Sequence, residues 1–129
     1  MKKYYFAAPL YKINKQTLEY SQEIHNKNRE ISEKIEKAGI SLILPQRDIN
    51  QTQSGNKVLN DELKIIKECD GLIVLMGHTP GIWVEVGLAK AWGKKIYGIK
   101  LKESWNLEWL DSLFDFISED VNDIINKLK

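Results

Sequence analysis

The stretch Gly71–Gly87, GLIVLMGHTPGIWVEVG, decides the predicted fold, because it passes from a buried strand through a loop into a helix. Its first six residues form an unbroken apolar run, which is typical of a strand covered on both faces of a parallel sheet. Glu85 is its single carboxylate and lies among apolar residues, where a charge costs desolvation energy unless it is paired or used. In open α/β sheets, ligands bind at the carboxyl ends of the strands. Glu85 is therefore the first candidate for chemistry, the alternative being a glutamate that only complements the helix dipole.

Outward from this stretch, apolar strand-like runs alternate with helical patterns along the chain. Pro9 and Pro45 end the first two runs, and Gly39 marks the end of the helix between them. We predict strands at 4–8, 40–44, 72–76, 95–99 and 116–117, helices at about 14–38 and 59–69, a helix that carries Glu85 and another after Ser118, a loop at 46–57, and an irregular or helical stretch at 105–114. This alternation predicts one domain, residues 1–129, built as a doubly wound α/β sandwich around a parallel sheet.

Composition excludes several classes of protein. The net charge of +1 gives no overall field to attract nucleic acid or a membrane surface, so we expect neither as a partner. A single cysteine, Cys69, excludes an internal disulfide and fits a reducing compartment, so we expect a cytoplasmic protein. No apolar run is long enough to cross a bilayer. We find no glycine-rich phosphate-binding loop and no metal-ligand spacing, and therefore expect no metal.

Four segments, in order along the chain, carry a resemblance to a known family. They are Tyr5-Phe6-Ala7-Ala8-Pro9-Leu10, then Leu44-Pro45-Gln46-Arg47-Asp48, then Glu62-Leu63 with Ile66 and Cys69-Asp70, and finally Gly81 with Glu85, Gly87 and Gly93-Lys94-Lys95. No segment is specific alone, but together they span nearly the whole chain and resemble the nucleoside 2-deoxyribosyltransferase family. The resemblance implies a five-stranded flavodoxin-like domain that cleaves the N-glycosidic bond of a nucleoside without a cofactor.

The resemblance also assigns roles to individual residues. Glu85 falls where the family has its nucleophile, which attacks the anomeric carbon and forms a covalent glycosyl-enzyme intermediate. Tyr5 matches the tyrosine that orients this nucleophile, the alternative being a core aromatic at the end of a strand. The partners implied are a nucleoside or nucleotide and a free base. The resemblance further implies substrate-binding roles for Ala7, Gln46, Asp48, Glu62, Thr79, Gly81 and Asn106.

Three departures from the family pattern bear on the reaction. Most members have Asp where this chain has Glu62, although Asp61 is adjacent. Transferases usually have, at the position of Thr79, an Asp that helps protonate the leaving base, and a hydroxyl cannot act as a general acid near neutral pH. Nucleoside 5′-monophosphate N-glycosidases have a phosphate-binding serine there, which favours the hydrolase branch. Their loop with glycine and arginine after the first strand is replaced by Leu10-Tyr11-Lys12, which favours the transferase branch.

Three hypotheses follow. The first is a transferase that moves 2-deoxyribose between bases through Glu85, and the second is a nucleoside or nucleoside 5′-monophosphate N-glycosidase that uses the same residue. The third is a nucleotide-binding module without turnover. Asn106 resembles a residue that reaches into the neighbouring subunit's site, so we expect a homodimer or a higher homo-oligomer.

Overall fold

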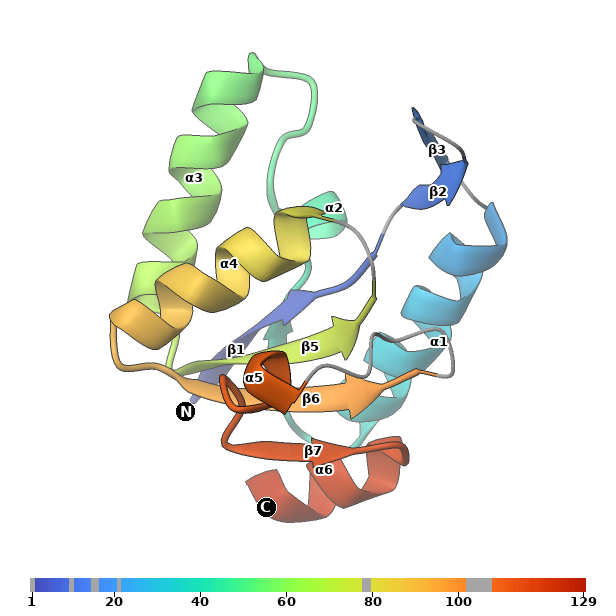
Figure 1. Ribbon diagram of the computed structural model, residues 1–129, viewed down its shortest axis with the longest axis vertical. Coiled ribbons are helices and arrows are strands. Elements are labelled where there is room, and N and C mark those ends of the chain that lie inside the picture. The colour runs from blue at the N-terminus through green and yellow to red at the C-terminus, as the bar shows by residue number, and fades with distance from the viewer. Residues whose placement is uncertain (1, 10, 15–16, 21, 78–79, 102–107) are drawn as a thin grey trace.

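The computed structural model describes residues 2–9, 11–14, 17–20, 22–77, 80–101 and 108–129, with backbone alone for 11–14 and 17–20. Its centre is a sheet of five strands, and every pairing in it is parallel (Figure 1). The order across the sheet is β4 (Ser41–Ile43), β1 (Lys3–Ala7), β5 (Gly71–Met76), β6 (Lys95–Lys100) and β7 (Phe116–Ser118). This is the flavodoxin-like strand order. From β1 the chain first adds β4 on one side and then β5 on the other, and the point between β1 and β5 where it changes side is where such sheets form a binding crevice. The predicted doubly wound, five-stranded parallel sheet is confirmed.

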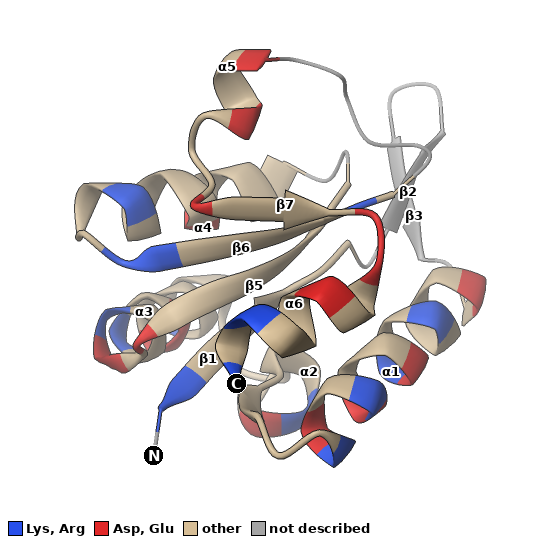
Figure 2. Cartoon of the chain, turned by 90° about the horizontal axis from the view of Figure 1, so that it is seen from below, with Lys and Arg blue, Asp and Glu red and all other residues tan. Residues whose placement is uncertain are grey.

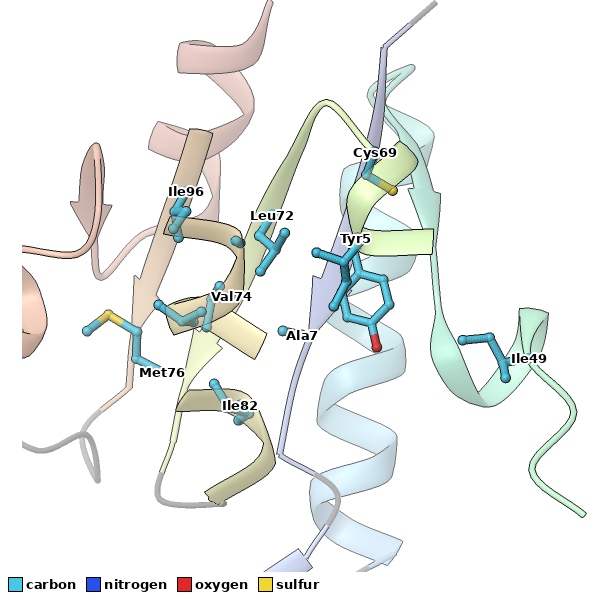
Figure 3. Packing of buried hydrophobic residues seen from close by; sticks show 12 residues of the cluster. Tyr5, Ala7, Ile49, Cys69, Leu72, Val74, Met76, Ile82 and Ile96 are labelled. Atoms are coloured by element: carbon cyan, nitrogen blue, oxygen red, sulfur yellow. The ribbon is translucent and has the colours of Figure 1, made fainter. Parts of the chain in front are cut away.

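Helices cover both faces of the sheet (Figure 1). One face packs against α1 (Gln22–Lys37) and α6 (Val121–Leu128), and the other against α3 (Gly55–Glu68) and α4 (Pro80–Ala91). Successive side chains of a strand point to opposite faces, so Tyr4 and Phe6 join the first core and Tyr5 and Ala7 join the second. Figure 3 shows Tyr5 and Ala7 projecting from β1 into this second core. The alternation therefore directs Tyr5 toward the helix that carries Glu85.

Glycines permit a close approach of two strands and the end of one helix in this fold. In the fully buried strand β5, a Cβ on Gly71 would lie 2.6 Å from the carbonyl oxygen of Lys95 on the neighbouring strand. Only glycine allows that approach of the two backbones. Gly39 follows α1 with a φ of +91°, the left-handed conformation that ends helices, as its position in the sequence predicts.

The long helix predicted from residue 14 is wrong in its first third. An antiparallel hairpin occupies this part, formed by β2 (Tyr11–Asn14) and β3 (Thr17–Tyr20), and α1 begins only at Gln22. Leu18 lies six residues before Ile24, and that spacing puts two side chains on different faces of a helix. Threonine and tyrosine also favour extended backbone.

The polar segment predicted as a loop over 46–57 is also partly helical. Its first residues form the short helix α2 (Pro45–Asp48), which starts with a proline, a residue suited to the first helical position. The following helix α3 starts at Gly55, where the Ser54 hydroxyl accepts a hydrogen bond from the Lys57 amide. The stretch predicted as irregular or helical contains α5 (Glu108–Asp111).

Charged residues of both signs are interleaved over the helices, most clearly along α1, whereas β5 carries none (Figure 2). This mixture agrees with the small net charge of the chain. Within the described ranges, no helix combines the length and the apolar character that a membrane span requires.

Candidate active site

A tyrosine and a glutamate from distant parts of the chain meet where β1 faces α4. The Tyr5 hydroxyl donates a hydrogen bond of 2.5 Å to Oε2 of Glu85. The Tyr5 side chain is fully buried in the apolar cluster, so its ring and hydroxyl are held rigidly. Glu85 is half-buried and keeps one side open. The structure thus brings together the two residues predicted as nucleophile and orienting group.

The surroundings of this pair change its protonation. Burial raises the pKa of Glu85 to about 7, the hydrogen bond from Tyr5 opposes that rise, and the negative charge of Glu62 adds to it. At neutral pH, about half of the Glu85 carboxyls are therefore ionised. Burial, together with the charge and hydrogen bond of Glu85, raises the pKa of Tyr5 far above its usual value, so its hydroxyl keeps its proton and acts as the donor.

Glu85 opens into a cavity of about 370 Å³ at the carboxyl end of β1. Its walls come from β1, the start of α2, the middle of α3 and the first half of α4. The predicted site residues on these walls are Tyr5, Ala7, Gln46, Glu62, Gly81 and Glu85. This volume is within the range of small-molecule sites, and its place in the sheet is where the fold binds ligands.

A second carboxylate lines the same cavity. Glu62 is half-buried, and burial raises its pKa. Its neighbour Asp61 does not line the cavity and accepts a hydrogen bond of 2.7 Å from the Gln53 amide instead. Of the two adjacent carboxylates, it is therefore Glu62 that faces the site.

Gly81 lies one helical turn before Glu85 on the cavity wall. A Cβ built on Gly81 would meet no atom within 4 Å. The missing side chain therefore leaves room beside the Glu85 carboxylate for a ligand.

Asp48, another predicted binding residue, does not line the cavity. Its carboxylate accepts hydrogen bonds from the Leu44 amide (2.8 Å) and from the Arg47 guanidinium (3.1 Å). These bonds hold the pKa of Asp48 below its usual value, although burial acts in the opposite direction. Arg47 also donates to Glu36 on α1 (2.9 Å) and to the Leu42 carbonyl of β4 (3.1 Å). The described hydrogen bonds of Asp48 therefore hold α2 in place.

Two predicted residues, Thr79 and Asn106, lie outside the described residues.

Two residues that the sequence analysis did not select, Leu59 and Val84, line the cavity. Leu59 precedes Glu62 by three positions and Val84 follows Gly81 by three positions, so helical spacing from the predicted site residues is the signal that identifies them. Across the described part of the chain, no group of three or more His, Cys, Asp or Glu residues is arranged to hold a metal ion.

Comparison with known proteins agrees with this geometry. The family model described as nucleoside 2-deoxyribosyltransferase matches residues 4–126. None of the curated proteins matches the sequence.

Several solved structures share the fold at low sequence identity. A 2-deoxyribosyltransferase from Bacillus psychrosaccharolyticus superposes with a TM-score of 0.78 at 18% identity, covering 96% of this chain and 90% of the other. A conserved protein from Enterococcus faecalis gives 0.76 at 19% identity, covering 98% and 96% of the two chains. A CMP N-glycosidase from Clostridium botulinum gives 0.64 at 20% identity, covering 98% of each chain. Because the family model matches residues 4–126, nearly the whole of this chain, the chain belongs to the nucleoside 2-deoxyribosyltransferase family.

Proposed function

We propose that this protein cleaves the N-glycosidic bond of 2′-deoxynucleosides and transfers the 2-deoxyribosyl group to another base through a covalent intermediate on Glu85. The observation that carries the proposal is the hydrogen bond from the buried Tyr5 to Glu85 in the wall of a ligand-sized cavity. The bond leaves the second carboxylate oxygen of Glu85 available to react. Family membership and the deoxyribosyltransferase of the same fold support the same chemistry.

In the first step, an oxygen of Glu85 forms a bond to the anomeric carbon as the carbon–nitrogen bond to the base breaks. The electron pair of the broken bond stays on the base nitrogen, which takes a proton from the site. In the second step, a nitrogen of the acceptor base forms a bond to the anomeric carbon. The bond between the anomeric carbon and Glu85 breaks as this new bond forms, and its electron pair returns to the carboxylate oxygen.

Glu62 is the proposed source of that proton. It lines the same cavity as Glu85, and a carboxylic acid in its protonated form can donate a proton to the leaving base. The acceptor base gives its proton back to Glu62 in the second step. This assignment supplies the acid that Thr79 cannot provide.

A second candidate function is hydrolysis, in which water instead of a base attacks the intermediate. Thr79, which takes the place of the transferase aspartate, favours this candidate, and the neighbour that is a CMP N-glycosidase extends it to nucleoside 5′-monophosphates. Both reactions use Glu85 in the same role.

The test is chromatography of mixtures containing the purified protein, 2′-deoxynucleosides or their 5′-monophosphates, and adenine or cytosine as acceptor. A new deoxynucleoside that is missing with Glu85→Ala supports transfer. Free base without a new nucleoside assigns hydrolysis, and the monophosphate samples identify the substrate. No product in any sample, together with ligand binding that survives Glu85→Ala, favours the non-catalytic module.

We also propose that the working unit is a homodimer or a higher homo-oligomer. The support is the resemblance of Asn106 to a family residue that completes the neighbouring subunit's site. Sedimentation velocity checks this, and a strict monomer with full activity contradicts it.

A further inference from the structure

We propose that Leu59 and Val84, here called the rim pair, form the wall against which the nucleobase lies. The proposal rests on the glycosyl-transfer function proposed above. It assigns one part of the substrate, the base, to one part of the cavity.

The first observation is an unusual exposure of apolar side chains. Among the described residues, the large exposed apolar side chains are Leu59, Val84 and Trp109, with exposed fractions of 46%, 56% and 68%. Two of these three line the cavity that contains Glu85, and they come from different helices, α3 and α4. Apolar side chains that are exposed together in a concave site are typical of ligand contact.

The second observation is a gradient of burial down the cavity walls. Along one face of α3, Leu59 is exposed, Glu62 is half-buried and Ile66 is fully buried. On α4, Val84 is exposed and the adjacent Glu85 is half-buried. The rim pair therefore lies on the solvent side of the two carboxylates.

The order of events in the reaction determines which part of the substrate meets the rim pair. The first base must leave and the second must enter while the sugar remains bonded to Glu85. The base must then lie on the solvent side of the sugar, between Glu85 and the mouth of the cavity. The apolar faces of a planar heteroaromatic base lose contact with water when they pack against Leu59 and Val84.

The charge of the cavity points to the same class of ligand. Among the described residues, its lining contains two carboxylates, Glu62 and Glu85, and no Lys, Arg or His. An anionic group against this wall would face like charge, whereas a neutral base with ring nitrogens can pair with a protonated carboxyl.

The test compares Leu59→Ala and Val84→Thr with the control Val58→Thr. Val58 is half-buried on α3 and does not line the cavity, and its substitution is the same change as that at Val84. Kinetics are measured with the acceptor base varied, or with the nucleoside varied if the enzyme is a hydrolase, and free 2-deoxyribose is added as a competitor. We expect the KM to rise about 4-fold in Val84→Thr, which loses one buried carbon, and up to about 50-fold in Leu59→Ala, which loses three. We expect kcat to change less than about twofold and the inhibition constant of 2-deoxyribose to stay constant.

Three results would overturn the proposal: an unchanged KM, an equal rise in Val58→Thr, or an equal loss of 2-deoxyribose inhibition. If the wild-type protein releases no base from any nucleoside, the glycosyl-transfer function fails, and adenine titration by calorimetry then decides the role of the rim pair. Adenine binding that weakens in Leu59→Ala supports the base wall. Adenine binding that stays unchanged, or is absent from the wild type, refutes it.

Discussion

Removal of one hydroxyl, by Tyr5→Phe, tests whether Tyr5 sets the ionisation of Glu85. The substitution keeps the buried ring in its apolar cluster and deletes the donor of the 2.5 Å hydrogen bond to Glu85. This bond stabilises the charged form of the carboxylate, so its loss raises the pKa of Glu85 above the value of about 7 that it has beside Tyr5.

The size of the effect follows from the strength of the bond. A hydrogen bond to a charged group contributes about 1.5–3 kcal/mol, which raises the pKa of Glu85 by about 1 to 2. At pH 7, the ionised fraction then falls from about one half to about 1–10%, and kcat/KM for base release falls about 5- to 50-fold. Only the ionised carboxylate attacks the anomeric carbon, so the loss is greatest at low pH.

The assay is the pH dependence of kcat/KM, which reports ionisation in the free enzyme. We expect the acid limb to have its midpoint near pH 7 in the wild type and about 1 to 2 higher in Tyr5→Phe. Tyr4→Phe is the matched control, because Tyr4 is buried on the opposite face of the same strand and belongs to the other core. An equal loss of activity at every pH in Tyr5→Phe, or a shifted midpoint in Tyr4→Phe, would show that the Tyr5 hydroxyl does not set the ionisation of Glu85.

Further predictions concern stability and space at the site. The folded-state pKa of Glu85 is raised, so its ionisation destabilises the fold as pH rises from about 4.5 through about 7. Glu85→Gln should raise the free energy of unfolding at pH 8 by about 1–3 kcal/mol and leave it unchanged at pH 4, as measured by denaturant titration; equal effects at both pH values would contradict this. Gly81→Ala should lower kcat/KM about tenfold by filling the space beside Glu85 without unfolding the protein. Gly87→Ala, on the same helix with equal space but away from the cavity, should keep full activity; the idea fails if the two variants behave alike. Arg47→Ala should lower the free energy of unfolding by about 1–2 kcal/mol through the loss of its links to α1 and β4, and an unchanged denaturation midpoint would show that these exposed bonds contribute nothing.

The sequence predicts the sheet because each buried strand carries its own signal. The apolar run of β5 and the prolines and glycine that end the segments around β1 and β4 are local patterns. The alternation of such strands with helices along the chain predicts a parallel sheet. The hairpin before α1 has no comparable signal, since its polar residues and Leu18 also fit the start of an amphipathic helix. The phase of the apolar residues and the strand preference of threonine and tyrosine are what separate the two.

In the candidate site too, some residues can be predicted from the sequence and others depend on contacts between distant segments. Tyr5 and Glu85 follow from the resemblance to the family, and the alternation along β1 explains why they meet. The position of Asp48 depends on Arg47, which bonds to Asp48 and to two distant segments, α1 and β4, through contacts that no motif encodes. The choice of Glu62 over Asp61 depends on the rotation of α3 about its axis, which packing determines.

Mass spectrometry of the protein shows whether Glu85 becomes covalently bonded to the sugar. The protein is mixed with a 2′-deoxynucleoside without acceptor base, quenched in acid within milliseconds, and digested to locate any added mass. We predict a mass gain of one 2-deoxyribosyl group on the peptide that contains Glu85, lost when adenine is added and absent from Glu85→Ala. Base release without a mass gain at any quench time, or a mass gain that persists in Glu85→Ala, would show that Glu85 does not form the covalent intermediate.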